Sequence, residues 1–200
     1  MLYDELIYKK NLPSNTSSRS LYNIAEKIRY EVLGGQMLKG IECDILNDGS
    51  LDYDDEILKQ FDAVIISVHS NLRMDEEKAT NRILKAIENP YSSILGHPTG
   101  RLLLSRKGYP LDHIKIIDAC AANGVHIELN ANPWRLDLDP EWIPYAMQKG
   151  IKISINPDAH SVRGIDDIKY GVLAAQGGGL TKDACLNAVS VEDFMASMKK

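Results

Sequence analysis

Residues 155–161 read INPDAHS, and the interpretation of the whole chain starts from this stretch. Residues 152–155 alternate between polar and apolar as a strand does, and Pro157 cannot continue a hydrogen-bonded ladder. Asp158 and His160 therefore follow the carboxyl end of a predicted strand. Side chains two positions apart in an extended segment point the same way, so this carboxylate and imidazole converge. The pair suits Zn, Mn or Fe, and a strand-end turn with a capping aspartate is the alternative.

Length, composition and charge describe one ordinary domain. The chain has 200 residues, of which 44% are hydrophobic and 26% are charged, as in a soluble globular protein with a sizeable core. No apolar run approaches the roughly 18 residues that span a membrane, and the first residues do not resemble a signal peptide. The net charge of -5 argues against a broad non-specific DNA-binding face. A nucleic-acid substrate bound at a metal-bearing site is still compatible with that charge.

The three cysteines indicate a reducing location. Cys43, Cys120 and Cys185 are widely spaced and odd in number, so they predict neither a disulfide framework nor a CxxC zinc site. We therefore expect a cytoplasmic protein that has no membrane segment.

The hydrophobic pattern alternates between strand and helix along the chain. The predicted strands are residues 37–43, 63–68, 93–96, 125–129 and 151–155. The predicted helices are residues 20–33, 55–61, 75–89, 111–123, 139–150, 181–189 and a short one from about 191. The expected N-caps include Ser20, Asp139 and Thr181, and residues 11–20 are expected to form a loop. This alternation predicts an α/β protein with a parallel sheet.

Two stretches resemble ligand loops but are better explained as turns. In residues 44–55, a calcium loop aligned on Gly49 would place Leu46 at a ligand position, which excludes it. The glycines at 177–179 lack the GxxxxGK[ST] pattern of a phosphate loop, so a turn into the next helix accounts for them.

A polar residue recurs at each predicted strand end. Glu42, His69, His97, Asn130 and Asn156 follow one another at intervals of 27, 28, 33 and 26 residues, each about one βα unit. In parallel sheets and barrels, functional sites are built at this end of the strands.

The histidines divide into two groups, and one of them favours a metal site. His113 falls in a predicted helix and His126 starts a strand, whereas the other three follow strands. A single strand-end histidine is more often a core or capping residue. Several ionisable residues at the same end of the strands are a stronger signal. The predicted metal ligands are therefore Glu42, His69, His97, Asp158 and His160. Imidazoles and carboxylates without sulfur indicate Zn, Mn or Fe used for Lewis-acid hydrolysis.

These motifs resemble a known family. Five motifs, in this order, are similar to the PHP (polymerase and histidinol phosphatase) domain, in particular to that of bacterial family X DNA polymerases. They are GIECDIL, SVHS, GHPTGRLL, ELNANPWRLDLD and INPDAHS. The resemblance covers residues 37–200 and implies a distorted (β/α)7 barrel that holds up to three divalent metals, usually Mn or Zn. It also implies phosphoesterase activity, which in family X polymerases is a 3′-5′ exonuclease that processes DNA ends.

The resemblance assigns roles to the predicted ligands. Glu42 matches the family's bridging carboxylate, and His69 and His97 match its next two ligands. Asp158 and His160 match the closing Asp-x-His pair.

The chain departs from the family pattern at its beginning. The family opens with His-x-His and further acidic and histidine ligands, but no histidine precedes His69. We therefore expect a PHP-type barrel that lacks its first strands, with residues 1–36 as an extension that includes part of the first helix. A closed barrel of this class typically has about 250 residues. An open barrel would leave strand edges exposed, so self-association or a separate polymerase module is expected to cover them.

The leading hypothesis is a metal-dependent phosphoesterase that acts on a nucleic-acid 3′ end or a small phosphate ester. The candidate substrate-binding residues are Arg73, Arg101, Asn130 and Asn132, each with a loop-stabilising or solvent-exposed role as the alternative. A catalytically inactive, truncated module is the second hypothesis. An amidohydrolase-type barrel is the third, but the metal-bridging lysine and early His-x-His of that class are not visible.

Overall fold

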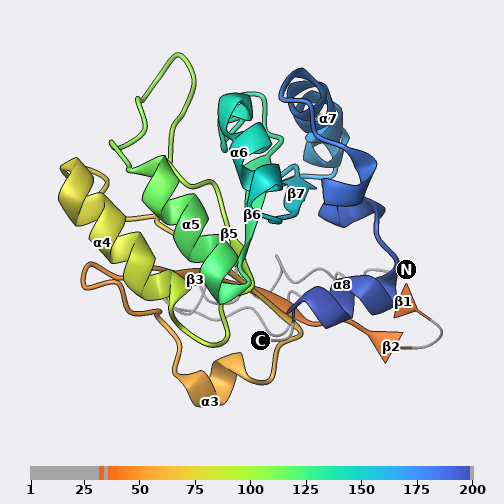
Figure 1. Ribbon diagram of the computed structural model, residues 1–200, viewed down its shortest axis with the longest axis horizontal. Helices are drawn as coiled ribbons and strands as arrows, with labels where there is room; N and C mark the ends of the chain where they lie inside the picture. Colours follow the sequence, from red (N-terminus) through yellow and green to blue (C-terminus); the bar gives the residue numbers. More distant parts are fainter. Residues whose placement is uncertain (1–31, 34–35, 199–200) are drawn as a thin grey trace.

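Five parallel strands form the central sheet of the computed structural model, which describes residues 32–33 and 36–198 (Figure 1). Each strand pairs with the strand that follows it in the chain. In order across the sheet, the strands are β3 (Gly40–Asp44), β4 (Ala63–Ser67), β5 (Ile94–Leu95), β6 (His126–Asn130) and β7 (Ile153–Asn156). The predicted α/β class with a parallel sheet is therefore confirmed.

Helices connect consecutive strands, and α4, α5, α6 and α7 stand side by side in chain order (Figure 1). α8 is set apart from these helices, near the carboxyl end of the chain. The α-helices are α3 (Asp55–Leu58), α4 (Glu76–Ile87), α5 (His113–Asn123), α6 (Ile143–Gln148), α7 (Ile168–Gly177) and α8 (Val191–Met198). The 3-10 turns are η1 (Pro140–Trp142), η2 (Arg163–Asp167), η3 (Lys182–Ala184) and η4 (Leu186–Ala188).

Local sequence signals set the ends of the longer helices. The Asp75 side chain accepts a hydrogen bond from the backbone of Lys78 at the start of α4, and Asp112 caps α5 in the same way. α5 ends where Gly124 takes a left-handed conformation, with φ of 64°. Asp139 caps η1 as predicted, and Pro140 occupies its first position.

Three of the sequence predictions for individual elements were wrong. Val32–Leu33, expected to end a helix, form β1, which pairs antiparallel with β2 (Gln36–Met37). The two intervening residues are Gly-Gly, a composition that favours hairpins, and β3 then begins at Gly40 instead of residue 37. The predicted helix at 181–189 is two 3-10 turns, and Thr181 makes no side-chain cap. α7, over Ile168–Gly177, was not predicted. The loop predicted at 11–20, and the helix from Ser20 as far as residue 31, lie outside the described residues.

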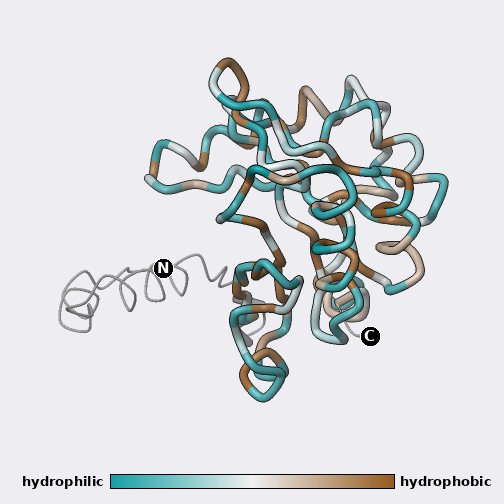
Figure 2. Tube along the Cα trace, turned by 90° about the vertical axis from the view of Figure 1, so that its left-hand side faces the viewer, coloured by the Kyte–Doolittle hydropathy of each residue, from teal (hydrophilic) through white to brown (hydrophobic). Residues whose placement is uncertain are grey.

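The two faces of the sheet have different surroundings, as the alternation of side chains in a strand requires. Odd-numbered positions of β3, such as Ile41 and Cys43, lie in the main core beneath the helices, together with Val64, Ile66, Leu95, Ile127, Leu129, Ile153 and Ile155. The opposite face borders a cavity of about 560 Å³. Figure 2 shows hydrophobic segments through the interior of the trace and hydrophilic segments in most outer loops.

The carboxyl-terminal segment covers one end of this second face. Ala63 and Ile94 of the sheet form a separate apolar cluster with Leu186 and Met198. The cavity therefore has an apolar end beside this cluster and a polar end where the strands finish.

Two further observations concern the cysteines and the helices. Cys43, Cys120 and Cys185 are free thiols. Among the helices of the described residues, none has both the length and the apolar character that crossing a membrane requires.

The contact of α7 with the sheet leads to a stability prediction. A Cβ atom added to Gly171 would come within 2.7 Å of Ile155 Cγ2 and would also overlap Ala131. We expect Gly171→Ala to destabilise the protein by about 1–3 kcal/mol, because the overlap outweighs the gain in helix propensity of about 1 kcal/mol. Urea unfolding followed by circular dichroism measures the change.

Gly177 of the same helix provides the matched control, since an added Cβ there meets nothing within 4 Å. Gly177→Ala should be neutral or slightly stabilising. If both variants had equal stability, α7 would not pack against the sheet as closely as described.

Candidate metal centre

The ends of the first three strands of the sheet bring together one carboxylate and two imidazoles. Glu42 lies on β3, and His69 and His97 each come two residues after the last residue of β4 and β5. Glu42 Oε1 is 3.2 Å from His69 Nε2 and 3.3 Å from His97 Nε2. Ligand atoms of these three residues all lie within 4.8 Å of one another, which is close enough for a single metal ion to bind all three.

His69 is oriented by a second carboxylate that sequence reasoning missed. Its Nδ1 contacts Asp44 Oδ1, which leaves Nε2 directed at Glu42. Burial disfavours the charged imidazole, but the hydrogen bonds with Asp44 and Glu42 outweigh it and raise the pKa of His69 to about 9. An imidazole with one ring nitrogen on a carboxylate and the other turned toward a cluster is the usual arrangement of a metal-ligating histidine.

His97 is buried in a way that fits a metal ligand. Its side chain is 2% exposed, and its backbone has a positive φ of 24°. Although Nε2 is 3.3 Å from Glu42 Oε1, neither ring nitrogen forms a hydrogen bond of good geometry within the described part of the chain. A buried polar group without a partner is costly, so such groups require a specific explanation. A cation held between His97 and Glu42 would supply the missing contact.

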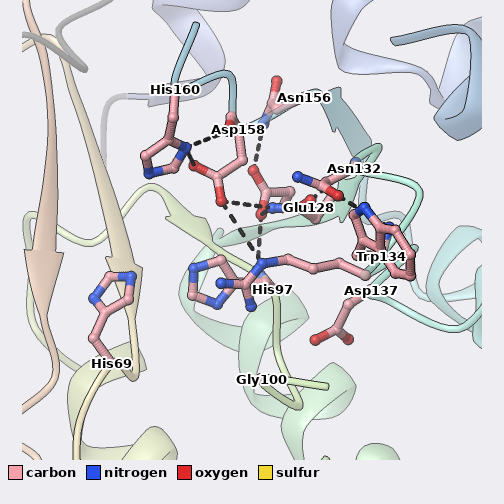
Figure 3. A network of polar contacts seen from close by, with 12 residues as sticks. His69, His97, Gly100, Glu128, Asn132, Trp134, Asp137, Asn156, Asp158 and His160 are labelled. Carbon is pink, nitrogen blue, oxygen red and sulfur yellow. Dashed lines mark hydrogen bonds and ion pairs between the residues drawn. The ribbon is translucent and has the colours of Figure 1, made fainter. Parts of the chain in front are cut away.

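Glu128 is the second residue that sequence reasoning missed. Its buried carboxylate accepts a hydrogen bond from the His97 backbone at 2.8 Å and another from Asn156 Nδ2 at 3.0 Å (Figure 3). Burial raises the pKa of this carboxyl group. The sequence contained a signal for it, because Glu128 is two residues before Asn130 in a strand and therefore on the same face.

Asp158 and His160 do not join the three-residue cluster. The Asp158 carboxylate is 3.4 Å from Asn130 Nδ2 and 3.8 Å from Arg135 Nε, and it lines the polar end of the cavity. The His160 side chain is 69% exposed, and its Nδ1 contacts the backbone oxygen of Asp158 at 2.7 Å. Figure 3 shows both residues above Glu128 and His97, with His69 to one side.

Arg73 and Arg101, two of the four candidate substrate-binding residues, have different surroundings. Arg73 is exposed on the loop after His69. Arg101 donates through Nε to the Arg135 backbone at 2.9 Å, and its other guanidinium nitrogens contact Leu136 O and Asp139. These contacts favour the loop-stabilising alternative for Arg101.

Asn130 is the last residue of β6, and Asn132 lies in the loop that follows it. The buried Asn130 side chain joins Glu128 and Asp158, and its Oδ1 accepts from the Asn132 backbone at 3.1 Å. Asn132 in turn accepts from the Trp134 backbone at 2.9 Å. Asp137, also buried, accepts from Thr99 and so ties this loop to the segment after His97.

Fold and site together define the class of protein, which is an α/β protein with a candidate divalent-metal centre at the carboxyl ends of its parallel strands.

A scan against protein-family models matched none. Relatives are found instead. A Bacillus subtilis protein named "DNA polymerase/3'-5' exonuclease PolX" is 42% identical over 165 residues, which are 82% of this chain and 29% of that protein. A probable phosphatase of Thermoanaerobacter sp. is 31% identical over 182 residues, 85% of this chain and 72% of the relative. A probable phosphatase of Caldanaerobacter subterraneus is 31% identical over 147 residues, which are 68% of this chain and 54% of that protein.

The chain belongs to the PHP family, and it is related to the PHP domain of family X DNA polymerases. It spans less than a third of the Bacillus protein and about half to three quarters of the two phosphatases.

Proposed function

We propose that the chain is a metal-dependent phosphoesterase that hydrolyses a nucleic-acid 3′ end or a small phosphate ester. The observation that carries this proposal is the Glu42, His69 and His97 cluster, in which a carboxylate lies between two imidazoles. Mn²⁺ or Zn²⁺ suits such a nitrogen and oxygen donor set. A divalent metal held there would supply Lewis-acid chemistry to the phosphate and to the attacking water.

The residues of the chain prepare the site in three ways. Asp44 fixes the ring orientation of His69, and Glu128 fixes the backbone at His97. The Glu42 carboxylate compensates the positive charge of the cation. The cavity beside these groups is large enough to admit a phosphate ester.

Asp158 and His160 are proposed as ligands of a further ion next to the first. Asp158 is 12% exposed and lines the same cavity as Glu42 and His97, which supports this assignment. Arg73, Asn130 and Asn132 are proposed to contact the substrate, and residues 37–200 are proposed to be the PHP domain.

The relatives support two substrate classes. The Bacillus protein carries a 3′-5′ exonuclease in its name, and the others are named probable phosphatases. A phosphodiester at a 3′ end and a phosphomonoester are therefore the substrates to compare. The free thiols support the proposal of a cytoplasmic location.

Restoring metal to stripped protein tests the proposal. Protein treated with EDTA is assayed with a 3′-labelled single-stranded oligonucleotide and with p-nitrophenyl phosphate, before and after Mn²⁺ is added. We expect Mn²⁺ to raise hydrolysis of at least one substrate by about tenfold or more. Isothermal titration calorimetry measures metal binding independently. Binding without hydrolysis would identify an inactive binding module, and absence of both would contradict the assignment of the site.

A further inference from the structure

We propose that Trp134 is a stacking platform for a nucleobase of single-stranded nucleic acid, next to the candidate metal centre. This inference rests on the proposed function, for which it specifies the substrate class. It starts from an exposed aromatic side chain that borders a hollow. Trp134 is 61% exposed, and it lines a hollow together with Asp158 and His160.

The loop holds the backbone of Trp134 in a fixed place. The Trp134 backbone N–H donates to Asn132 Oδ1 at 2.9 Å, and its carbonyl oxygen accepts from the Leu103 backbone at 2.6 Å. The next residue, Arg135, is anchored through its own carbonyl oxygen by Arg101 Nε at 2.9 Å. A ring on an anchored loop loses little conformational freedom on binding, which favours a recognition role.

A hairpin forms the opposite wall of the site. Residues 102–106 close on themselves through an antiparallel bridge between Leu102 and Arg106, and Leu104 at the tip is 98% exposed. A hollow of about 320 Å³ lies between the hairpin and the loop after β6, lined by Leu102, Leu103, Asn132, Trp134, Asp158 and His160 among others. This volume is at the lower end of the range for small-ligand pockets, about 300–1,000 Å³, and so fits one nucleoside.

The surroundings favour a nucleotide over a purely apolar ligand. Arg135 lines the hollow, and the exposed Lys107 directly follows the hairpin. Arg106, at the base of the hairpin, donates to the Gly100 carbonyl oxygen through Nε and Nη2. Asn132 offers an amide to a base edge. The hollow shares Asp158 with the cavity that holds the Glu42 cluster, and Figure 3 shows Trp134 and Asn132 beside the network that includes Asp158 and His97. Aromatic stacking with nearby cations is the usual way in which single strands are bound without sequence preference.

Fluorescence tests the stacking directly. The chain has two tryptophans, so in a Trp142→Phe background the emission comes from Trp134 alone. Trp142 lies outside the hollow and stacks on His113. We expect saturable quenching by oligothymidylate and none by deoxyribose 5-phosphate, which lacks a base. Equal quenching by both probes, or by neither, would overturn the proposal.

Three substitutions of Trp134 separate stacking from apolar contact. We expect Trp134→Ala to weaken binding of a fluorescein-labelled oligothymidylate, followed by anisotropy, by about tenfold, and Trp134→Phe to weaken it much less. Trp134→Leu should resemble Trp134→Ala, since leucine provides apolar area without a ring. If leucine restored binding as well as phenylalanine, the site would be an apolar contact. If Trp134→Ala changed only the oligomeric state, the surface would bind another protein chain.

The same variants distinguish this proposal from the proposed function. Mn²⁺-dependent hydrolysis of a glycerol phosphodiester, which has neither a nucleobase nor any other aromatic ring, should be unchanged in Trp134→Ala, whereas KM for the oligonucleotide should rise. Unchanged oligonucleotide affinity with intact ester hydrolysis would overturn the stacking site alone. Ring-dependent oligonucleotide binding without any hydrolysis would overturn the phosphoesterase and leave the stacking site.

Discussion

Substituting Glu42 with glutamine is expected to weaken Mn²⁺ binding, and to lower the hydrolysis that depends on it, by at least about 100-fold. Glutamine keeps the size of the side chain but removes the negative charge from between His69 and His97. Replacing a group that merely orients a ligand typically costs about 10- to 100-fold, so losing a direct ligand should cost more. Calorimetry measures the binding, and release of labelled nucleotide measures the activity.

Glu88→Gln is the matched control, because Glu88 is exposed at the end of α4, which leads into the amino end of β5, and it lines neither the cavity nor the hollow. It removes the same charge and should leave binding and activity unchanged. Glu42→Gln should also retain the circular dichroism of the parent. Undiminished metal binding in a folded Glu42→Gln protein would show that the metal is held elsewhere.

Substituting Glu128 with alanine is expected to weaken metal binding by about 10- to 100-fold without removing a ligand. The change leaves the His97 backbone N–H and Asn156 Nδ2 without their acceptor in a buried region. Leaving such donors unsatisfied also costs about 1–3 kcal/mol of folding free energy each. Calorimetry and urea unfolding, carried out on the same preparation, measure the two effects.

Glu128→Gln separates the two roles of this side chain. Its amide oxygen can still accept from the His97 N–H, so both losses should be smaller than in Glu128→Ala. A Glu128→Ala protein that was less stable but bound metal as the parent does would restrict Glu128 to a structural role.

Much of the candidate site could be read from the sequence because β-strands impose a simple geometry. Polar residues that end successive parallel strands must share one edge, and Glu42, His69 and His97 are brought together there. The role of Asp158 and His160 stays a prediction. Their spacing indicated that they would converge, but the positive φ of Asp158, 48°, shows that the segment is not extended at that point.

Residues that act through tertiary contacts were harder to identify. Asp44 meets His69 across 25 positions of the sequence, and Glu128 meets the His97 backbone across 31. No local pattern encodes such pairs. The polar and apolar alternation of residues 126–130 places Glu128 on the same face as Asn130, but its contact with the His97 backbone depends on the tertiary fold.

The fold errors have a similar origin. Residues 181–189 have a plausible cap and helical spacing, yet Ile153 forms a parallel bridge with Cys185, and Asn187 bonds to the Ile155 backbone. These contacts with the edge of β7 hold the segment in short turns. α7 was missed because Gly171 interrupts its helical pattern, whereas this glycine is what allows the helix to approach the sheet.

The chain-order pairing of the five strands bears on how the protein assembles during synthesis. Each strand needs only its predecessor as a template, so the sheet can grow from its amino-terminal side while the ribosome is still extending the chain. Glu42, His69 and His97 all belong to the first half of these 200 residues. An ion captured by the nascent half would contribute its binding free energy to folding and hold the first three strands in register before β6 and β7 exist. Metal supply would then influence the yield of folded protein as well as its activity.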